Sequence, residues 1–421
     1  MATNLQTPIV NQLIRSVNFF NGRLLTGEDL TADQQANRAA HNILGKAIGS
    51  GVAYGLEVTT SVKLNNSLNP VLTVSKGLAI NGRGGQLLLA DDTDVTLVRP
   101  AAASSAPAQI FQDCKPVTSG VYIAGAGVYM LTIGPASSPQ GSAQANGIGT
   151  VAASCNSDYN AYGVQFRLLQ VDQTMGLTQA QLADRNHLQN LVAYKCFGVD
   201  SWNSIWTDPL GSPVEQFGFV DTLRSNQALT DCEVPLAVMY WTADQGILFV
   251  DMWPVRRPVV APGASDQQPI SSGQRRTAEG LAMLLQFQSQ IANLPSTLTG
   301  TVAATDYFSY LPPLGFLPVR NGKIPNGFDY LQFFINRTYP PPAYLEGARL
   351  SALVVQSMLY PPIDLGAEEM LWLYSVRENQ QAIDHALTNP PQLYFAFTNG
   401  KIPFQGEAQF DLNYWNYATF A

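Results

Sequence analysis

Five carboxylates near the carboxyl end are the side chains best suited to catalysis. They lie among many aromatic residues at Asp329, Glu346, Asp364, Glu368 and Glu369. Two carboxylates about five to ten Å apart would serve a glycosidase, one as general acid and the other as nucleophile or base. No nucleophile elbow, paired metal-ligand helix motif or phosphate-binding loop accompanies them. We therefore predict that the protein is not an enzyme, and keep a carbohydrate-binding or glycoside-cleaving role as the alternative.

Metal and thiol chemistry would need ligands that are grouped. The three histidines and four cysteines are instead isolated along the chain, at His41, His187, His385, Cys114, Cys155, Cys196 and Cys232. Their spacing supports no zinc site, so we predict neither metal nor cofactor. The cysteines are interpreted as buried free thiols, with one or two disulfides as the alternative. Asp384 and His385 resemble a metal-phosphohydrolase dyad but lack the further histidines, which favours a surface pair.

Two parts of the sequence could suggest a phosphate-binding site, and neither has the residues that such a site needs. The glycine-rich run Asn81–Gly85 lacks a Gly-Lys-Ser/Thr ending and stands between two apolar runs, so it predicts a β-hairpin. The pairs Arg256-Arg257 and Arg275-Arg276 are the only adjacent basic residues, and the net charge is −8. A nucleic-acid interface needs a basic face, so we predict no nucleic-acid partner and interpret both pairs as solvated or salt-bridged.

The composition indicates a protein that is covered by others. Charged residues make up 13% of the 421 residues, against about 25% in ordinary domains. Such a surface either relies on neutral polar side chains or is hidden against partners, and we favour a large contribution from the second. We expect neither a signal peptide nor a membrane span, because the first residues do not combine a basic start with an apolar stretch and no apolar run is long enough to span a bilayer. We expect a cytoplasmic protein until it is assembled, with peripheral envelope or membrane contact still open.

The stretch Asn18 to Val58 contains a predicted helix and the strand that follows it. Thr26 is a good N-cap, so a helix should begin at about Gly27. Apolar residues on helical spacing give this helix one apolar face, which we expect to pack against another surface; they are Leu30, Ala36, Ala40, Ile43, Leu44 and Ala47. Glycines then end the helix before a strand over Val52 to Val58. Arg23 is interpreted as a local structural tie rather than a ligand-binding group.

The fold class that follows is α+β and β-rich, with small antiparallel sheets or sandwiches and a few connecting helices. We predict further helices over Thr178–Tyr194, Gln274–Leu294 and Leu345–Leu359, a long loop over Pro135–Asn156, and a hairpin of Glu233–Trp241 with Ile247–Asp251. Aromatic residues over Tyr307–Tyr339 are assigned to a core in preference to a sugar-stacking platform. The predicted domains are a helix-plus-β docking domain (1–105), a β-rich middle domain (106–260), a connecting helix (261–300) and an aromatic-rich, sandwich-like α+β domain (301–421).

The opening residues resemble a known family. The pattern Phe-Phe-x-Gly-Arg-Leu-Leu-Thr, a helix, Gly-Val-x-x-Gly-Leu-x-Val, and then Val-x-x-Gly-x-Ala before a hydrophobic residue resembles accessory baseplate or tail-associated proteins of phage-tail-like contractile injection systems. It corresponds here to Phe19, Phe20, Gly22, Arg23, Leu24, Leu25, Thr26, Gly51, Val52, Gly55, Leu56, Val58, Val74, Gly77, Ala79 and Ile80. The match covers about the first hundred residues. The chain departs from the pattern in its helix, where many relatives carry a longer basic and aromatic version.

The resemblance implies a structural component on the baseplate or tail periphery of such a particle. Its partners would be other baseplate or tail subunits and further copies of this chain. It implies an assembly motif, rather than a catalytic site, made of Phe19, Phe20, Gly22, Arg23, Leu24, Leu25, Thr26, Gly51, Val52, Gly55 and Leu56.

Overall fold

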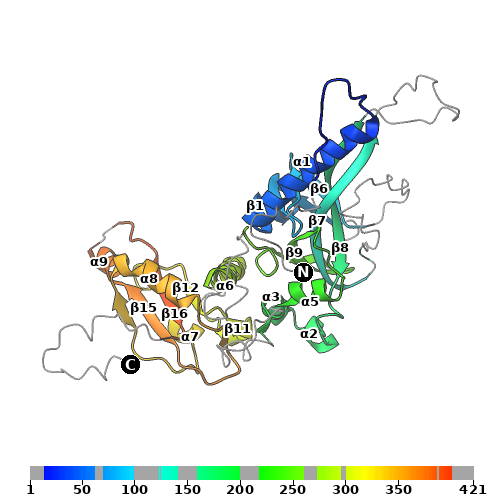
Figure 1. The fold of residues 1–421 in the computed structure, drawn as a ribbon. Coiled ribbons are helices and arrows are strands. Elements are labelled where there is room, and N and C mark those ends of the chain that lie inside the picture. The colour runs from blue at the N-terminus through cyan, green and yellow to red at the C-terminus, as the bar shows by residue number, and fades with distance from the viewer. Residues whose placement is uncertain are drawn as a thin grey trace, which may run out of the picture.

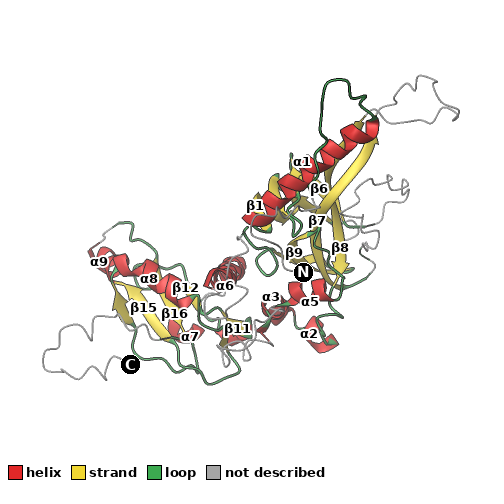
Figure 2. Ribbon diagram, in the orientation of Figure 1, coloured by secondary structure: helices red, strands yellow, loops and turns green. Residues whose placement is uncertain are grey.

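The computed structural model describes residues 14–61, 70–98, 123, 125–140, 159–199, 218–259, 273–294, 300–385 and 388–400. Helices and several small sheets alternate along the chain, which confirms the α+β class predicted from the sequence (Figure 2). The elements from α1 to β10 form one lobe and those from β11 to β16 form a second, with α6 between them (Figure 1).

The first lobe is built on an antiparallel sheet in the order β10-β9-β7-β8. Its strands are β7 (Gly127–Gln140), β8 (Tyr159–Gln170), β9 (Val234–Thr242) and β10 (Gly246–Asp251). Neighbouring residues of a strand point to opposite faces, so Tyr129 and Leu131 enter one core while Val128 and Met130 enter another. Because both faces are covered, every residue of β9 is buried.

One face of this sheet is covered by two three-stranded sheets, β1-β4-β5 and β2-β3-β6. Their strands are β1 (Gly51–Gly55), β2 (Val58–Thr60), β3 (Val71–Val74), β4 (Gly77–Ile80), β5 (Gln86–Leu89) and β6 (Thr93–Thr96). The turn Asn81–Gly85 joins β4 to β5, as the sequence predicts. Leu56, Leu72 and Met239 belong to the same buried cluster, so strands on both sides of residue 105 share one core. The predicted domain boundaries stay a prediction.

The other face is covered by helices α2 (Gln179–Ala183), α3 (Arg185–Phe197) and α5 (Phe219–Ser225). The sequence predicts one helix over Thr178–Tyr194, and this is wrong in one respect. Thr178 does cap a helix, but the chain breaks at Asp184, whose side chain accepts a hydrogen bond from the backbone N–H of His187 and starts α3 afresh. A capping residue inside a helical pattern therefore produced two helices instead of one.

The second lobe is a four-stranded sheet, β12-β16-β15-β13, in which β13 runs parallel to β15. Helix α6 packs by β12, and α9 by β15 and β16. The elements are α6 (Gly273–Asn293), η3 (Ala304–Asp306), β11 (Tyr310–Leu311), β12 (Leu314–Val319), α7 (Tyr330–Phe333), β13 (Ala343–Leu345), α8 (Gly347–Ser357), β14 (Ile363–Asp364), β15 (Trp372–Val376), α9 (Arg377–His385) and β16 (Leu393–Thr398). The predicted helices over Gln274–Leu294 and Leu345–Leu359 correspond to α6 and α8.

The aromatic residues of this lobe form its core, as the sequence analysis favours. Phe308, Phe333 and Phe334 are each 1% exposed. Phe334 packs edge-on against Phe397 of β16, with ring centroids 5.4 Å apart, and Phe287 of α6 does the same at 5.2 Å. Edge-to-face pairs add to the free energy gained by burying the rings. The core is thus closed by a helix packed on a sheet.

Two further predictions are wrong at element boundaries. The strand expected over Val52 to Val58 is divided, because Leu56 has a positive φ of 56° and turns the chain from β1 into β2 of a different sheet. The loop expected over Pro135–Asn156 begins later, because β7 continues to Gln140. The partner strand β8 explains this extension, since it pairs with β7 along that whole length.

A polar seam joins the two lobes. The Asn190 side chain of α3 donates to the Tyr310 carbonyl and accepts from the backbone N–H groups of Ser309 and Tyr310. Beside it, the Tyr194 and Tyr310 rings stack with centroids 5.3 Å apart. Asp251 at the end of β10 accepts from Gln189 of α3 at 3.0 Å and from Gln286 of α6 at 3.2 Å. Burial raises the pKa of Asp251 to about 6.

Of the two described cysteines, one matches the free-thiol interpretation and the other matches the disulfide alternative. Cys196 is a buried free thiol, whereas Cys232 is disulfide-bonded. Other predictions lie outside the described residues, namely those for Cys114, Cys155, and the side chains of Arg275 and Arg276.

Candidate functional site

The start of α1 (Gly27–Ile48) is fixed by local contacts that the sequence predicts. Thr26 accepts a hydrogen bond from the backbone N–H of Asp29, and the Asp29 carboxylate accepts from the backbone N–H of Thr26. That backbone hydrogen bond is the largest cause of the lowered pKa of Asp29, to which Arg23 also contributes. Arg23 donates to Asp29 at 2.5 Å and to the Asn18 carbonyl at 2.9 Å. Arg23 is therefore the structural tie that we expected.

The apolar side chains on either side of Arg23 face solvent. Phe19 is 51% exposed, Phe20 61%, Leu24 86% and Leu25 51%. Large apolar side chains of this kind are usually buried when they gather in one segment, and a contiguous exposed group marks an interaction surface. The first half of the assembly motif thus points away from the protein's own core.

The apolar face of α1 is exposed as well. We call its six residues the α1 stripe, and none of them is buried; they are Leu30, Ala36, Ala40, Ile43, Leu44 and Ala47. Leu44 is 61% exposed and Leu30 52%. Gly45 is the one buried residue of this helix. We expected the apolar face to pack against another surface, and within the part of the chain that the structure describes it lacks one.

Helix α1 is attached to its own lobe through its other side. Gly45 lies against Gly84 of the β4–β5 turn so closely that a Cβ on either glycine would meet the backbone of the other segment. Further along, the Arg38 guanidinium lies over the Tyr162 ring of β8, 4.3 Å from its centroid, and donates to the Tyr162 hydroxyl. With 3.6 residues per turn, Arg38 and Gly45 are on one side of the helix and Leu44 and Ala40 on the other.

The second half of the assembly motif has a different place. Val52 and Leu56 are buried in the core of the first lobe. Gly51 and Gly55 have positive φ and lie against backbone, Gly51 near Pro258 and Gly55 near Lys76. These four positions therefore hold the fold together, and the exposed surface comes from the positions between Phe19 and Ile48.

The outer part of the β7–β8 hairpin lies beside α1, a contact that the sequence analysis did not predict (Figure 1). Residues of β7 beyond Ile133 pair only with β8 among the described strands. Tyr159 and Tyr162 of β8 are 73% and 51% exposed. A two-stranded ribbon is marginally stable alone, so its contact with α1 supports both elements.

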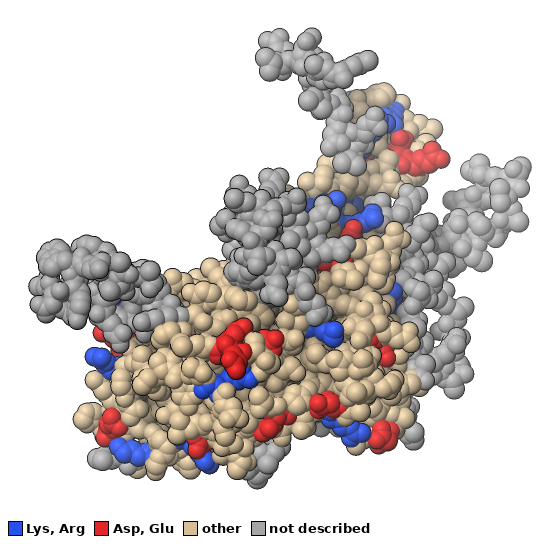
Figure 3. Space-filling model, turned by 90° about the horizontal axis from the view of Figure 1, so that it is seen from below, with Lys and Arg blue, Asp and Glu red and all other residues tan. Residues whose placement is uncertain are grey.

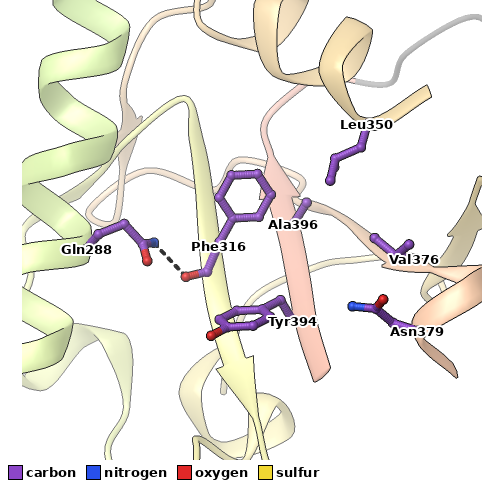
Figure 4. Close-up of a pocket in the computed structure, with 7 residues that line it drawn as sticks. All are labelled: Gln288, Phe316, Leu350, Val376, Asn379, Tyr394 and Ala396. Atoms are coloured by element: carbon purple, nitrogen blue, oxygen red, sulfur yellow. Dashed lines mark hydrogen bonds between the residues drawn. The ribbon is translucent and has the colours of Figure 1, made fainter. Parts of the chain in front are cut away.

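A pocket of about 300 Å³ lies in the second lobe between α6, α8, α9 and the sheet. Figure 4 shows the Gln288 carboxamide donating to the Phe316 carbonyl, with Tyr394 and Leu350 among the other side chains that line the pocket. None of the seven residues that line it is a carboxylate; they are Gln288, Phe316, Leu350, Val376, Asn379, Tyr394 and Ala396. This pocket is therefore not equipped for two-carboxylate glycoside hydrolysis.

Three of the five carboxylates singled out in the sequence have structural partners. Asp329 caps α7 and lies 3.7 Å from Arg320. Glu346 lies 3.6 Å from Arg349, and Asp364 accepts from the backbone N–H of Gly366. The pKa of Glu369 is raised, mainly by burial and then by Asp364.

The remaining candidate groups are also engaged in the fold or dispersed. Arg257 pairs with Glu279 through two contacts of 3.1 and 2.7 Å, and Arg256 donates to the Gly55 carbonyl. Within the described ranges no three His, Cys, Asp or Glu side chains are grouped to hold a metal ion. In the same part of the chain, no helix has the length and apolar character to cross a membrane.

The surface is sparsely charged. In Figure 3 the described residues of one face are mostly neutral, with small groups of acidic and basic side chains between them. Neither a scan against protein-family models nor a search of curated proteins finds a match to this chain.

Proposed function

We propose that this protein is a non-enzymatic structural subunit of a phage-tail-like contractile injection system. It would attach to the baseplate or tail periphery through the N-terminal apolar surface, defined as Phe19, Phe20, Leu24, Leu25 and the α1 stripe. The resemblance of the opening residues supplies the kind of particle. The observation that carries the proposal is the exposure of this surface, since leaving so much apolar area in water is unfavourable unless a partner covers it.

The geometry fits a docking role because the contacts that hold α1 on its lobe do not involve its exposed apolar side chains. The N-cap and the Arg23 tie hold the leading segment at the start of α1. The Gly45 contact and the Arg38–Tyr162 contact hold the helix on the lobe without using the apolar residues. A preorganised apolar surface loses less conformational entropy on binding than a flexible one.

The test compares particle incorporation for two substitutions of similar exposure. Leu25→Asp places a charge at a residue that is 51% exposed within the N-terminal apolar surface, and Val355→Asp places one on α8, where Val355 is 58% exposed. Particles assembled with Leu25→Asp should purify without this subunit, because a buried unpaired charge opposes docking. Particles with Val355→Asp should retain it. Equal incorporation of the two variants would contradict the proposal.

The alternative is a carbohydrate-binding or glycoside-cleaving tail component, and the pocket supports only the binding part of it. Tyr394 lines the pocket and is 41% exposed, and an exposed aromatic ring can stack on a sugar. A glycan array with the wild-type protein and Tyr394→Ala, together with a reducing-sugar assay, separates the two functions. Turnover that Glu369→Gln or another carboxylate substitution abolishes would establish the enzyme and refute the structural role.

A further inference from the structure

The seam between the lobes contains a histidine that faces two hydrogen-bond acceptors. His187 of α3 has its Nδ1 2.8 Å from the Asp184 carboxylate and its Nε2 2.9 Å from the backbone carbonyl oxygen of Thr305, in η3 of the second lobe. A neutral imidazole carries one N–H and can donate to only one of these oxygens, whereas an imidazolium donates to both. Both contacts are therefore complete only when His187 is protonated.

The contact that a neutral His187 loses is the one between the lobes. A hydrogen bond to a carboxylate is stronger than one to a neutral carbonyl, so a neutral ring keeps its N–H on Nδ1, toward Asp184. Its Nε2 then presents a lone pair to the Thr305 carbonyl oxygen. The carboxylate of η3, Asp306, accepts from the backbone N–H of Ala303 in its own turn.

A second titratable group in the seam also favours its protonated form. Asp251 is 3% exposed at the end of β10, and it accepts from neutral donors, namely the side chains of Gln189 in α3 and Gln286 in α6 and the backbone N–H of Trp253. Burying an ionised carboxylate among neutral groups is unfavourable. The Oε1 atom of Gln286 is buried and has no hydrogen-bond partner among the described residues, and Asp251 can offer it a donor only when protonated.

The titratable groups packed around Asp251 do not balance its charge. Arg257, which follows β10, is paired with Glu279 of α6 at 2.7 Å. The Cys196 thiol of α3 stays neutral, because burial raises its pKa. Burial is likewise the largest cause that raises the pKa of Asp251 to about 6. The stabilisation that Asp251 gives to the closed seam is therefore complete below pH 3.8 and is lost as the pH rises through about 6.

We propose that the seam is a pH-sensitive joint, which holds the two lobes together in mildly acidic conditions and opens more often as the pH rises to neutral and above. His187 and Asp251 reach the seam from different elements of the first lobe, and one faces η3 while the other faces α6, the helix between the lobes (Figure 1). Histidine ordinarily changes charge between pH 5 and 8, so the two groups lose their protons over the same range and weaken the seam together. The inference does not depend on what the N-terminal apolar surface binds.

Amide hydrogen exchange of the purified full chain measures the joint, because two backbone N–H groups donate across the seam. Those of Ser309 and Tyr310 bond to the Asn190 side chain, so they exchange when the seam opens. Dividing each rate by the intrinsic exchange rate at that pH gives the opening equilibrium. With the pKa of Asp251 at about 6 in the closed seam and 3.8 when exposed to water, opening should increase about tenfold from pH 5 to pH 8, and His187 adds to this increase.

Urea separates opening of the joint from global unfolding. Opening exposes little surface, so exchange at Ser309 and Tyr310 should change little with urea concentrations below the unfolding transition. The amides of β9, whose residues are all buried, should exchange faster with each addition of urea. An opening equilibrium that is the same at both pH values, or a urea dependence equal to that of β9, would overturn the inference.

Variants assign the effect to the two side chains. Asp251→Asn keeps an oxygen acceptor and cannot ionise, and His187→Gln keeps an N–H donor and cannot gain a proton, so the double variant should open equally at both pH values. The matched controls are His41→Gln on α1 and Asp91→Asn between β5 and β6, which are exposed outside the seam and should keep the wild-type increase. A double variant that also keeps this increase would refute the assignment. Thermal melting checks that each variant is folded, and the wild-type measurement decides the inference if the double variant is not.

Discussion

The contact between Gly45 and Gly84 supplies the sharpest prediction about the docking helix. In an exposed helix, replacing glycine by alanine stabilises the helix by about 1 kcal/mol. At Gly45 the added Cβ would instead lie 2.8 Å from the Cα and carbonyl carbon of Gly84 and would clash with its carbonyl oxygen. These atoms are backbone, so no side-chain rotation relieves the clash, and α1 or the β4–β5 turn must move.

The size of the expected effect on α1 depends on how few other contacts hold this helix on its lobe. Over-packing a tight contact costs about 1–3 kcal/mol, which exceeds the gain in helix propensity. Gly45 is the one buried residue of α1, so separating the helix from the lobe is the easiest way to relieve the clash. We therefore expect α1 to open more often in Gly45→Ala, with amide exchange over residues 27–48 about tenfold faster, corresponding to 1.4 kcal/mol.

Hydrogen–deuterium exchange with peptide resolution is the assay, and Gly27→Ala is the control. Gly27 lies in the same helix, and a Cβ there would meet nothing within 4 Å. That variant should exchange at the wild-type rate or more slowly. If Gly45→Ala protects α1 as well as Gly27→Ala does, the close backbone approach does not attach the helix and the reasoning is wrong.

Three further predictions concern groups buried in the core and the seam. Glu233→Gln should lower the free energy of unfolding by about 3–5 kcal/mol in urea denaturation, because it leaves the buried guanidinium of Arg167, now 2.6 Å from the carboxylate, without a charge partner. Burial raises the pKa of Asp251 from 3.8 to about 6. Between these two pH values the carboxyl group is protonated in the folded state and ionised in the unfolded state. Stability from this group is complete below pH 3.8 and is lost as the pH rises through about 6, by roughly 3 kcal/mol in total, and Asp251→Asn should remove this slope from the melting temperature. Burial also raises the pKa of the Cys196 thiol, so iodoacetamide should label Cys196 in urea but not in the native protein at a mildly alkaline pH.

Elements specified by neighbouring residues could be predicted from the sequence. The Thr26 cap, the Arg23 tie and the hairpin of β9 with β10 depend on contacts a few residues apart. Helix α6 was predicted from an apolar stripe that does enter the core, with Phe287 fully buried. In each case the local preference and the tertiary contacts agree.

Features that depend on distant residues could not be predicted. Arg167 and Glu233 are 66 positions apart. Arg167 is on β8 and Glu233 directly precedes β9, and the two side chains meet across β7, which pairs with both strands. The positive φ of Leu56 was unexpected, since a strand pattern continues on both sides of it. Its cause is tertiary, because the chain must pass from β1 in one small sheet to β2 in another.

The α1 stripe shows a different limit of sequence reasoning. Periodicity places Leu30, Ala40 and Leu44 on one face of a helix, but it says nothing about which body covers that face. The contacts of Gly45 and Arg38 decide the matter, because they turn the opposite side of the helix toward its own lobe. In α1 a glycine and a cation–π contact face the lobe and the apolar residues face outward, which is the arrangement expected of a helix at an interface. An ordinary core helix would have the reverse orientation.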